Sequence, residues 1–206
     1  MATAEKLART YTYADYQCWP EEERWELIEG TAYAMTAPLR IHQAVVFEVG
    51  GQIRDYLKAQ NANCRAYVAP FAVRLPKPNQ SDDKTDTVVE PDIVVVCDKT
   101  KLDRRGCRGA PDWIIEVLST STALKDMNLK RELYEKHGVK EYWIVHPEER
   151  WVMIYVLDAQ GKYGKPLMLG MDEVSRVITF NDLTIDWAFL AEFDEPLEPN
   201  SDSTAL

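Results

Sequence analysis

Two apolar runs constrain the fold of this 206-residue chain more than any other feature of its sequence. The runs are Ile93–Cys97 and Trp113–Leu118, and neither alternates apolar with polar residues. Strands without alternation are covered on both faces, so both runs are expected in the middle of a sheet. Each run nevertheless carries an acid, Asp92 directly before the first and Glu116 inside the second. Because an unpaired buried carboxylate is costly, each acid should be neutral, ion-paired or bound to a metal.

A divalent cation is the partner that best suits two such acids. If the two strands are neighbours, the carboxylates of Asp92 and Glu116 form a site for Mg²⁺, which takes one or two carboxylates, several waters and substrate phosphates. Asp92 alone, after Pro91, also fits ordinary turn chemistry. The pair therefore supports the site more strongly than either residue does.

A helix expected over Leu124–His137, closed by Gly138, adds a cation to this site. Asp126, Lys130 and Tyr134 are spaced by four and share one helix face. Because the helix begins just beyond the second acidic strand, its first turns can lean back over the strand end. Lys130 would then balance the negative charge and orient or deprotonate a water. A surface ion pair between Asp126 and Lys130 is the alternative interpretation.

The rest of the pattern predicts an α/β fold with a mixed β-sheet core, flanking helices and added β-hairpins. Apolar residues recur every four positions over Ile41–Ala59, and a Thr12–Asp15 capping box precedes a short helix over Tyr13–Trp19. Apolar runs bounded by turn residues predict strands elsewhere. The expected strands are Arg24–Ile28, Thr31–Thr36, Cys64–Ala69, Phe71–Leu75, Val88–Cys97, Asp112–Leu118, Lys140–Val145, Trp151–Leu157, Gly161–Leu169 and Val174–Phe180. Asp98–Ala110 is expected to be a basic loop.

Composition excludes some classes of protein and suggests one domain. Hydrophobic residues make up 46% of the chain, enough for a full core, which excludes a disordered protein. The net charge of −10 excludes a generally basic nucleic-acid coat protein. Five acids and no lysine or arginine follow position 191. We therefore expect a single domain over residues 1–191 and an acidic, disordered tail over residues 192–206.

The cysteines and the lack of long apolar segments predict a cytoplasmic protein. None of the four cysteines, Cys18, Cys64, Cys97 and Cys107, belongs to a C-x-x-C pair, and Cys97 is expected to be an ordinary core residue. The first ten residues contain no apolar signal-peptide stretch, and no run approaches the length of a membrane span. No membrane association is expected.

The order of the candidate residues resembles a known nuclease signature. Asp92, then an acid in a strand, then a lysine is similar to the PD-(D/E)XK pattern. A wider string of motifs, spanning roughly Tyr11–Leu190, resembles the Uma-two family of restriction endonucleases within that superfamily. The motifs are Trp25–Gly30, His42, Glu90–Asp92, Glu116–Ser119, Asp126 with Lys130 and Tyr134, and Gly138–Trp143. One position departs from the general signature, because Leu118 stands where its lysine is expected.

The resemblance implies a restriction-endonuclease-like core, a homodimer, and a Mg²⁺ cofactor for which Mn²⁺ substitutes. It implies that Asp92, Glu116 and the Val117 carbonyl hold the metal and that Glu26 completes the site. Lys130 would replace the missing lysine and activate the water, with Lys125 as the alternative. His42 would contact water on the metal or the phosphate. Glu26 as a surface hairpin acid and His42 as a structural residue are the other interpretations.

Further residues are candidates for contact with phosphate. Ser119 and Ser121 could donate to it or merely cap the helix, and Arg104, Arg105 and Arg108 could contact it non-specifically or lie in solvent. The leading hypothesis is a metal-dependent DNA endonuclease. The alternatives are a nucleic-acid-binding module with a degenerate site, a structural domain whose buried acids pair internally, and an enzyme acting on a small phosphate ester.

Overall fold

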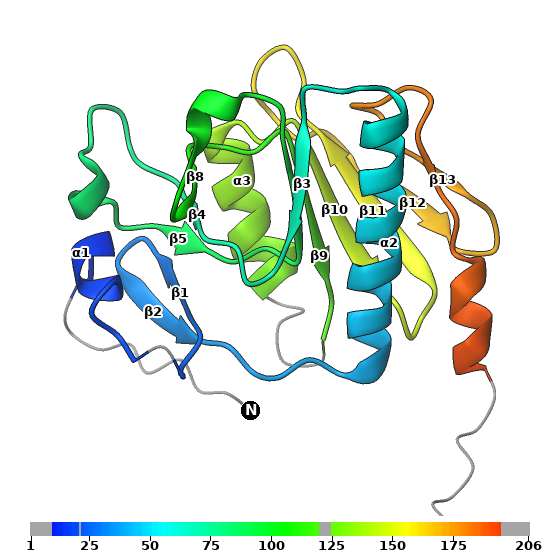
Figure 1. The fold of residues 1–206 in the computed structure, drawn as a ribbon, viewed down its shortest axis with the longest axis horizontal. Coiled ribbons are helices and arrows are strands. Elements are labelled where there is room, and N and C mark those ends of the chain that lie inside the picture. Colours follow the sequence, from blue (N-terminus) through cyan, green and yellow to red (C-terminus); the bar gives the residue numbers. More distant parts are fainter. Residues whose placement is uncertain (1–9, 21, 120–124, 195–206) are drawn as a thin grey trace, which may run out of the picture.

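A central sheet of six strands forms the core of the protein (Figure 1). The computed structural model describes residues 10–20, 22–119 and 125–194. The strand order is β12 (Leu167–Gly170), β11 (Trp151–Val156), β10 (Glu141–His146), β9 (Trp113–Val117), β6 (Ile93–Val96) and β3 (Arg65–Val68). Only the β9–β10 pair is parallel among the ladders of this sheet in the described chain, so the sheet is mixed as the sequence predicts.

A second sheet, which we call the flanking sheet, packs beside the first. Its order is β2 (Thr31–Ala34), β1 (Trp25–Ile28), β5 (Val88–Val89), β4 (Val73–Arg74), β8 (Gly106–Arg108) and β7 (Leu102–Asp103). The predicted β1–β2 hairpin is confirmed. Glu29 and Gly30 have φ values of 48° and 81° at its turn, the left-handed conformation that tight hairpins of this type require.

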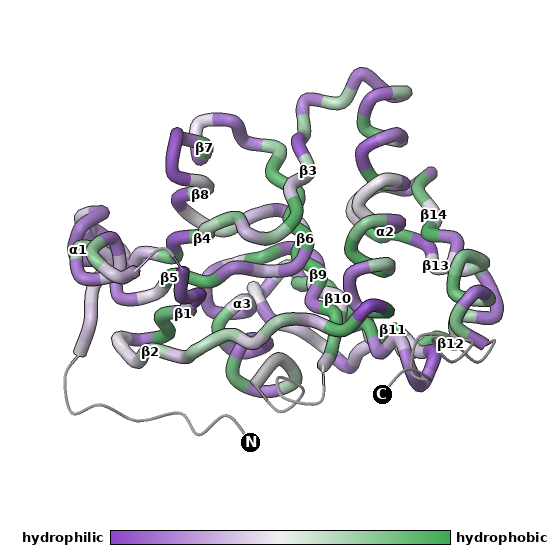
Figure 2. Tube along the Cα trace, turned by 60° about the horizontal axis from the view of Figure 1, so that its bottom comes forward, coloured by the Kyte–Doolittle hydropathy of each residue, from purple (hydrophilic) through white to green (hydrophobic). Residues whose placement is uncertain are grey.

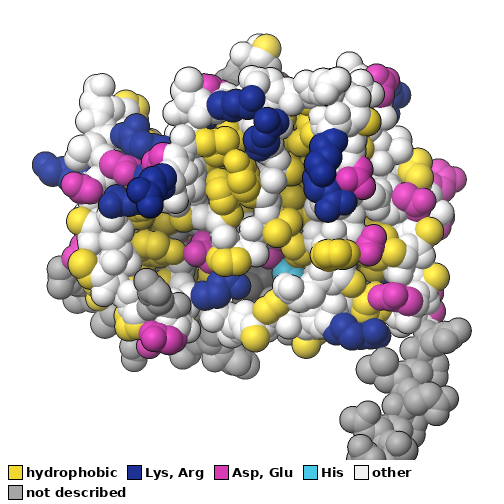
Figure 3. All heavy atoms as spheres, viewed as in Figure 1, with side chains coloured by type: hydrophobic (Ala, Val, Ile, Leu, Met, Phe, Trp, Pro, Cys, Tyr) yellow, Lys and Arg dark blue, Asp and Glu magenta, His cyan; other side chains and the backbone are white. Residues whose placement is uncertain are grey.

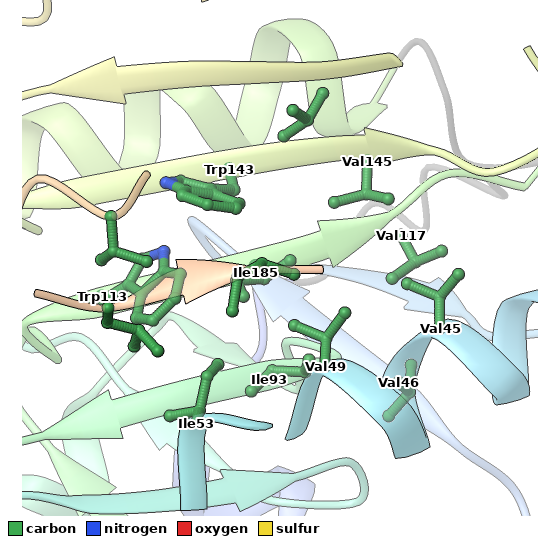
Figure 4. Close-up of a cluster of buried hydrophobic side chains, with 14 of the residues drawn as sticks. Val45, Val46, Val49, Ile53, Ile93, Trp113, Val117, Trp143, Val145 and Ile185 are labelled. Atoms are coloured by element: carbon green, nitrogen blue, oxygen red, sulfur yellow. The ribbon is translucent and has the colours of Figure 1, made fainter. Parts of the chain in front are cut away.

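Helices cover both faces of the central sheet. α2 (Arg40–Ala59) lies on one face, where Val45, Val49 and Ile53 meet strand residues such as Ile93 (Figure 4). The short hairpin β13–β14 (Ser175–Arg176 and Thr184–Ile185) and the helical segment η4 (Ala188–Phe193) complete that layer. α3 (Arg131–His137) covers the other face, and the four-residue α1 (Tyr13–Tyr16) begins the chain at the flanking sheet.

The two apolar runs occupy the interior strands β6 and β9, as predicted. Every residue of both strands is buried, and Figure 2 shows them among the most hydrophobic stretches of the chain. Their residues alternate between two cores: Ile93 and Val95 face α2, whereas Val94 and Val96 belong to the core that contains Leu133 of α3. Strands covered on both faces need no polar positions, which explains why the sequence does not alternate.

The expected strand Val88–Cys97 is wrong in one respect, because the chain changes sheets within it. β5 belongs to the flanking sheet and β6 to the central sheet, with Glu90, Pro91 and Asp92 between them. Proline has no N–H to donate to a ladder and restricts the residue before it, so Pro91 favours a break between sheets. The crossover places Asp92 at the boundary of the two sheets.

Two other expectations are corrected. The predicted loop Asp98–Ala110 contains the β7–β8 hairpin, whose Gly106 has a φ of 129° and lies against the backbone of Ala72. The predicted helix Leu124–His137 is π-helical over Lys125–Lys130, named η3 here, and α-helical only over Arg131–His137 before Gly138 closes it. Its first residue lies outside the described chain.

The expectation that Cys97 is a simple core residue is wrong, because Cys97 forms a disulfide with Cys64. These cysteines flank β6 and β3, whose antiparallel register brings them together. The cysteines therefore no longer support the predicted cytoplasmic location. Cys107 is buried and unpaired, and Cys18 is exposed and unpaired.

The C-terminal helical segment continues beyond the expected domain boundary at position 191. Arg40 lies over the ring of Phe193 at 4.3 Å, and Arg150 pairs with Asp194 at 2.7 Å. Residues 195–206 of the predicted tail lie outside the described residues. No helix in the described ranges is both long and apolar enough to cross a membrane.

Replacement of Ile53 by alanine tests the packing of α2 on the central sheet. Ile53 is fully buried, so the Ile53→Ala variant should lose about 2–5 kcal/mol of unfolding free energy in urea titrations. Phe47 lies on the same helix with 76% of its surface exposed, and Phe47→Ala should change stability by less than about 0.5 kcal/mol. Equal losses in the two variants would contradict this packing.

Candidate active site

The two predicted acids lie on neighbouring strands at one end of the central sheet. β6 and β9 are antiparallel with Ile93 opposite Ile115, so Asp92 and Glu116 occupy the next opposed position. This position brings the backbone before β6 close to β9, and the side chains of Asp92 and Glu116 line one cavity. The predicted juxtaposition of Asp92 and Glu116 therefore follows from the register of two buried strands.

Lys130 lies between two buried carboxylates. Its Nζ is 2.8 Å from Glu116 Oε1 and 2.7 Å from Glu26 Oε1. Only 3% of Lys130 and none of Glu26 is exposed, so this cluster is shielded from water. The interpretation of Glu26 as a surface acid of the hairpin is wrong. Burial of a cation between two anions is tolerable because each charge compensates the other at close range.

Tyr134 supplies a further donor to the same carboxylate. Its hydroxyl donates to Glu116 Oε1 at 2.7 Å, from a position one turn after Lys130 on the same helix face. Burial raises the pKa of Tyr134 well above its usual range, and the negative charge of Glu116 raises it further. Tyr134 therefore remains a neutral O–H donor throughout the physiological range.

Asp92 is oriented by one backbone group and one histidine. The Val117 N–H donates to Asp92 Oδ2 at 2.8 Å, and His42 Nε2 lies 3.2 Å from the same oxygen. His42 stands in the first turn of α2, with its side chain 9% exposed. Its Nδ1 is buried without a hydrogen-bond partner among the described residues. Such an unpartnered nitrogen is costly, so a water or ligand group is expected to meet it.

Arg24, Tyr16 and Glu90 extend the network beyond the predicted residues. The backbone N–H of Glu90 donates to Glu26 Oε1 at 3.2 Å. The Glu90 side chain accepts from Arg24 Nη2 at 2.8 Å and from the Tyr16 hydroxyl at 3.1 Å. Burial raises the pKa of Tyr16, and the nearby Glu90 carboxylate adds to this effect. Hence the sheet crossover at Glu90–Asp92 holds Glu26 in place.

A cavity of about 80 Å³ joins these groups. It is lined by all of the predicted site residues, Asp92, Glu116, Lys130, Glu26, His42 and Val117, and also by Arg24, Glu90 and Ser119. Within the ranges that the structure describes, no three histidine, cysteine or acidic side chains converge as a metal-binding group. Four acids line the cavity: Glu26 and Glu116, which both pair with Lys130, Glu90, which pairs with Arg24, and Asp92.

Burial alone does not mark these acids as special. Glu141 on β10 is also fully buried, and it accepts from Trp143 Nε1 at 2.7 Å and from the Thr179 N–H at 2.6 Å. These donors are neutral and anchor the segment after β13 to the sheet. Glu116 differs because its partners include a buried ammonium group and it borders a cavity. The ammonium group and the cavity, rather than burial, thus distinguish Glu116 from Glu141.

Other candidate residues are separate from the cavity. Arg104, Arg105 and Arg108 do not line it, and Arg108 pairs with Asp82 on the flanking-sheet side. Ser121 and the side chains of Lys125 and Asp126 lie outside the described residues. The sequence provided no reason to assign a role to Arg24 or Glu90, although Glu90 belongs to the motif Glu90–Asp92 and Arg24 directly precedes the motif Trp25–Gly30. Tyr134 was placed on the correct helix face without a function.

Removal of the buried ammonium group tests the electrostatics of this cluster. In EDTA, Lys130→Met should lose about 3–5 kcal/mol of unfolding free energy, because it leaves Glu26 and Glu116 uncompensated. Lys136 pairs with Glu29 at the surface, where both side chains are about half exposed, so Lys136→Met should lose about 0–1 kcal/mol. The Glu26→Gln/Lys130→Met double variant should regain part of the loss. Similar effects of the two lysine substitutions in urea titrations would argue against a buried charge cluster.

Comparison with known proteins agrees with the geometry. A solved structure described as "a putative nuclease belonging to DUF820", from Anabaena variabilis ATCC 29413, superposes with a TM-score of 0.69. The two chains are 23% identical, and the match covers 88% of this chain and 98% of the other. At this identity the likeness establishes the fold, and it confirms the predicted nuclease-like α/β class. No curated protein matches the sequence closely enough to be reported as a relative.

The sequence also matches a protein family across most of its length. The family is Uma2, described as "Putative restriction endonuclease", and the match covers residues 13–188. This range includes both sheets and every residue that lines the cavity. The resemblance inferred from the motifs is therefore confirmed, and the chain belongs to the Uma2 family.

Proposed function

We propose that this protein is a Mg²⁺-dependent endonuclease that hydrolyses phosphodiester bonds in DNA. One observation carries the proposal: Lys130 is buried between Glu26 and Glu116, beside Asp92, at the wall of a cavity. The family and the fold support a nuclease. Mg²⁺ dependence, DNA as the substrate and the individual residue roles are parts of this proposal.

The donor set suits a hard divalent cation. Asp92 and Glu116 would hold Mg²⁺ together with the Val117 carbonyl, and all three provide oxygen ligands. A site with two carboxylates also fits an ion that keeps several waters and accepts substrate phosphate. When bound, the ion would polarise the scissile phosphate and lower the pKa of a nearby water.

Lys130, as an ammonium group, would orient the attacking water through a hydrogen bond and stabilise the negative charge that develops as the water loses its proton to a nearby carboxylate or to solvent. Glu26 and Glu116 fix the position of its ammonium group from two sides, which limits the motion of a flexible side chain. Tyr134 occupies a further lone pair of Glu116 as a neutral donor. These contacts hold the ammonium group of Lys130 in one position before substrate binds. A group fixed in this way is preorganised for catalysis.

His42 would position Asp92 and contact the phosphate. Its Nε2 is 3.2 Å from Asp92 Oδ2, so an N–H on that nitrogen can donate to the carboxylate. The buried Nδ1 would then accept a hydrogen bond from a water, and His42 would contact the phosphate through that water. The homodimer and the cytoplasmic location implied by the sequence stay predictions.

The same cluster supports one rival function. Lys130 pairs the two buried acids internally, which is the arrangement expected of a structural domain whose nuclease site is degenerate. The two proposals differ in their response to metal. A working site should be stabilised by Mg²⁺ or Mn²⁺ through linkage, whereas a purely structural ion pair should not.

Plasmid cleavage tests the proposed activity. Supercoiled DNA incubated with the protein and Mg²⁺ or Mn²⁺ should be nicked, and EDTA should stop the reaction. Glu116→Gln and Lys130→Met should each lower the rate at least about 100-fold, the scale of an acid–base or metal-ligand contribution. Glu132 is an exposed acid of α3, so Glu132→Gln is the matched control and should retain activity.

The possible outcomes separate the parts of the proposal. A folded protein that neither cleaves DNA nor gains melting temperature with Mn²⁺ would contradict the nuclease and favour the structural rival. A clear rise in melting temperature with Mn²⁺, without cleavage of DNA, would support the metal site and refute DNA as the substrate. Nicking that survives in Glu116→Gln would mean that the activity lies elsewhere.

A further inference from the structure

A second hollow with aromatic walls adjoins the candidate active site. Its volume is about 370 Å³, and its lining includes Tyr16, Trp19 and Trp25 together with Pro70, Arg24 and Glu90. Figure 3 shows hydrophobic, acidic and basic side chains close together over the region of α1 and β5. We call this hollow the aromatic pocket. None of the nuclease chemistry proposed above uses its aromatic side chains.

Trp19 is the centre of an aromatic cluster in this pocket. Its ring centroid lies 5.3 Å from Tyr11, 5.3 Å from Tyr16 and 5.7 Å from Trp25. The interplanar angles are 83°, 53° and 65°, so no described ring is stacked parallel on Trp19. These inclined neighbours fix the orientation of the indole. They do not stack parallel on its face, which is the arrangement that a flat heterocycle would adopt.

The aromatic pocket and the active-site cavity share a wall. Arg24 and Glu90 line both hollows, and the consecutive residues Ala69 and Pro70 line one hollow each. Arg24 is paired with Glu90 at 2.8 Å, so the shared wall carries little net charge. A ligand that reaches across this wall would place one part near Lys130 and another part beside Trp19.

We propose that the aromatic pocket binds one unpaired nucleobase of the nucleic acid that enters the active site. This inference rests on the proposed function and adds the substrate class, a strand with an unpaired or extruded nucleotide. Bases stack on aromatic side chains without regard to sequence, because every base has a π-face. A base inside a duplex cannot present that face, so it must leave the helix or come from a single strand.

The charges around the pocket favour a base over a phosphate. Glu90 and the exposed Glu23, which accepts from Trp25 Nε1 at 2.9 Å, are acidic. The one described cation of the lining, Arg24, is already paired with Glu90, so a phosphate would find no free counter-charge there, whereas the Glu23 carboxylate can accept a hydrogen bond from the exocyclic amino group of a base. An uncharged heteroaromatic ring therefore matches the lining better than the sugar–phosphate backbone does.

Binding of matched DNA duplexes tests the inference without catalysis. The probes are fluorescein-labelled duplexes that carry either one bulged deoxyadenosine or a bulged abasic nucleotide at the same position. Anisotropy titrations use the full chain in EDTA and again with Ca²⁺. The wild-type protein should bind the bulged base about tenfold more tightly than the abasic bulge, the gain that one base–aromatic stack provides.

Substitutions locate the effect in the aromatic pocket. Trp19→Ala should abolish the preference for the base, and Trp19→Phe should keep most of it. Trp151 lies on β11, where its Nε1 donates to Glu149, and Trp151→Ala is the matched control that should keep the full preference. Melting temperatures establish that each variant is folded.

Each contrary result has a distinct meaning. Equal affinity of the wild-type protein for the two bulges would overturn the base-binding inference and leave the nuclease proposal intact. A preference that survives in folded Trp19→Ala would place the base elsewhere and also overturn the inference. Failure to bind either duplex in both buffers would contradict the inference and the proposed nucleic-acid substrate together.

Discussion

One ammonium group between two buried carboxylates determines how the candidate site is organised. Lys130 contacts Glu26 on β1 of the flanking sheet and Glu116 on β9 of the central sheet, at 2.7 and 2.8 Å. This contact joins two sheets and the η3–α3 helical region at one point. Charges this deeply buried cost desolvation free energy, and well-packed apolar residues would serve stability as well or better. Their presence beside a cavity is the observation on which the proposed function rests.

The crossover at Glu90–Asp92 makes this contact possible. β5 pairs with β1, which carries Glu26, and β6 pairs with β9, which carries Glu116. Because β5 and β6 are consecutive in the chain, the short segment through Pro91 fixes the separation of the two acids and places Asp92 beside them. The backbone of Glu90 also donates to Glu26. A proline that cannot take part in a ladder is well suited to this position.

Much of the fold and of the site could be predicted from the sequence. The non-alternating runs correctly predicted two interior strands, and the resulting register explains why Asp92 and Glu116 lie together. The helix periodicity placed Lys130 and Tyr134 on one face, and both reach Glu116. The crossing of the chain from the flanking sheet to the central sheet was not predicted, because the apolar residues of Val88–Cys97 are typical of a single strand. The Cys64–Cys97 disulfide and the Arg24–Glu90 pair were also missed, since both depend on contacts between residues distant in sequence.

In the proposed site, Asp92 and Glu116 hold a divalent cation beside Lys130. Anomalous diffraction from crystals soaked in Mn²⁺ would test it most directly, because the signal locates the ion without reference to activity. We expect a peak between the Asp92 and Glu116 carboxylates, near the Val117 carbonyl, that disappears in Asp92→Asn crystals treated in the same way. Mn²⁺ bound only at other acids, or unchanged by Asp92→Asn, would contradict it.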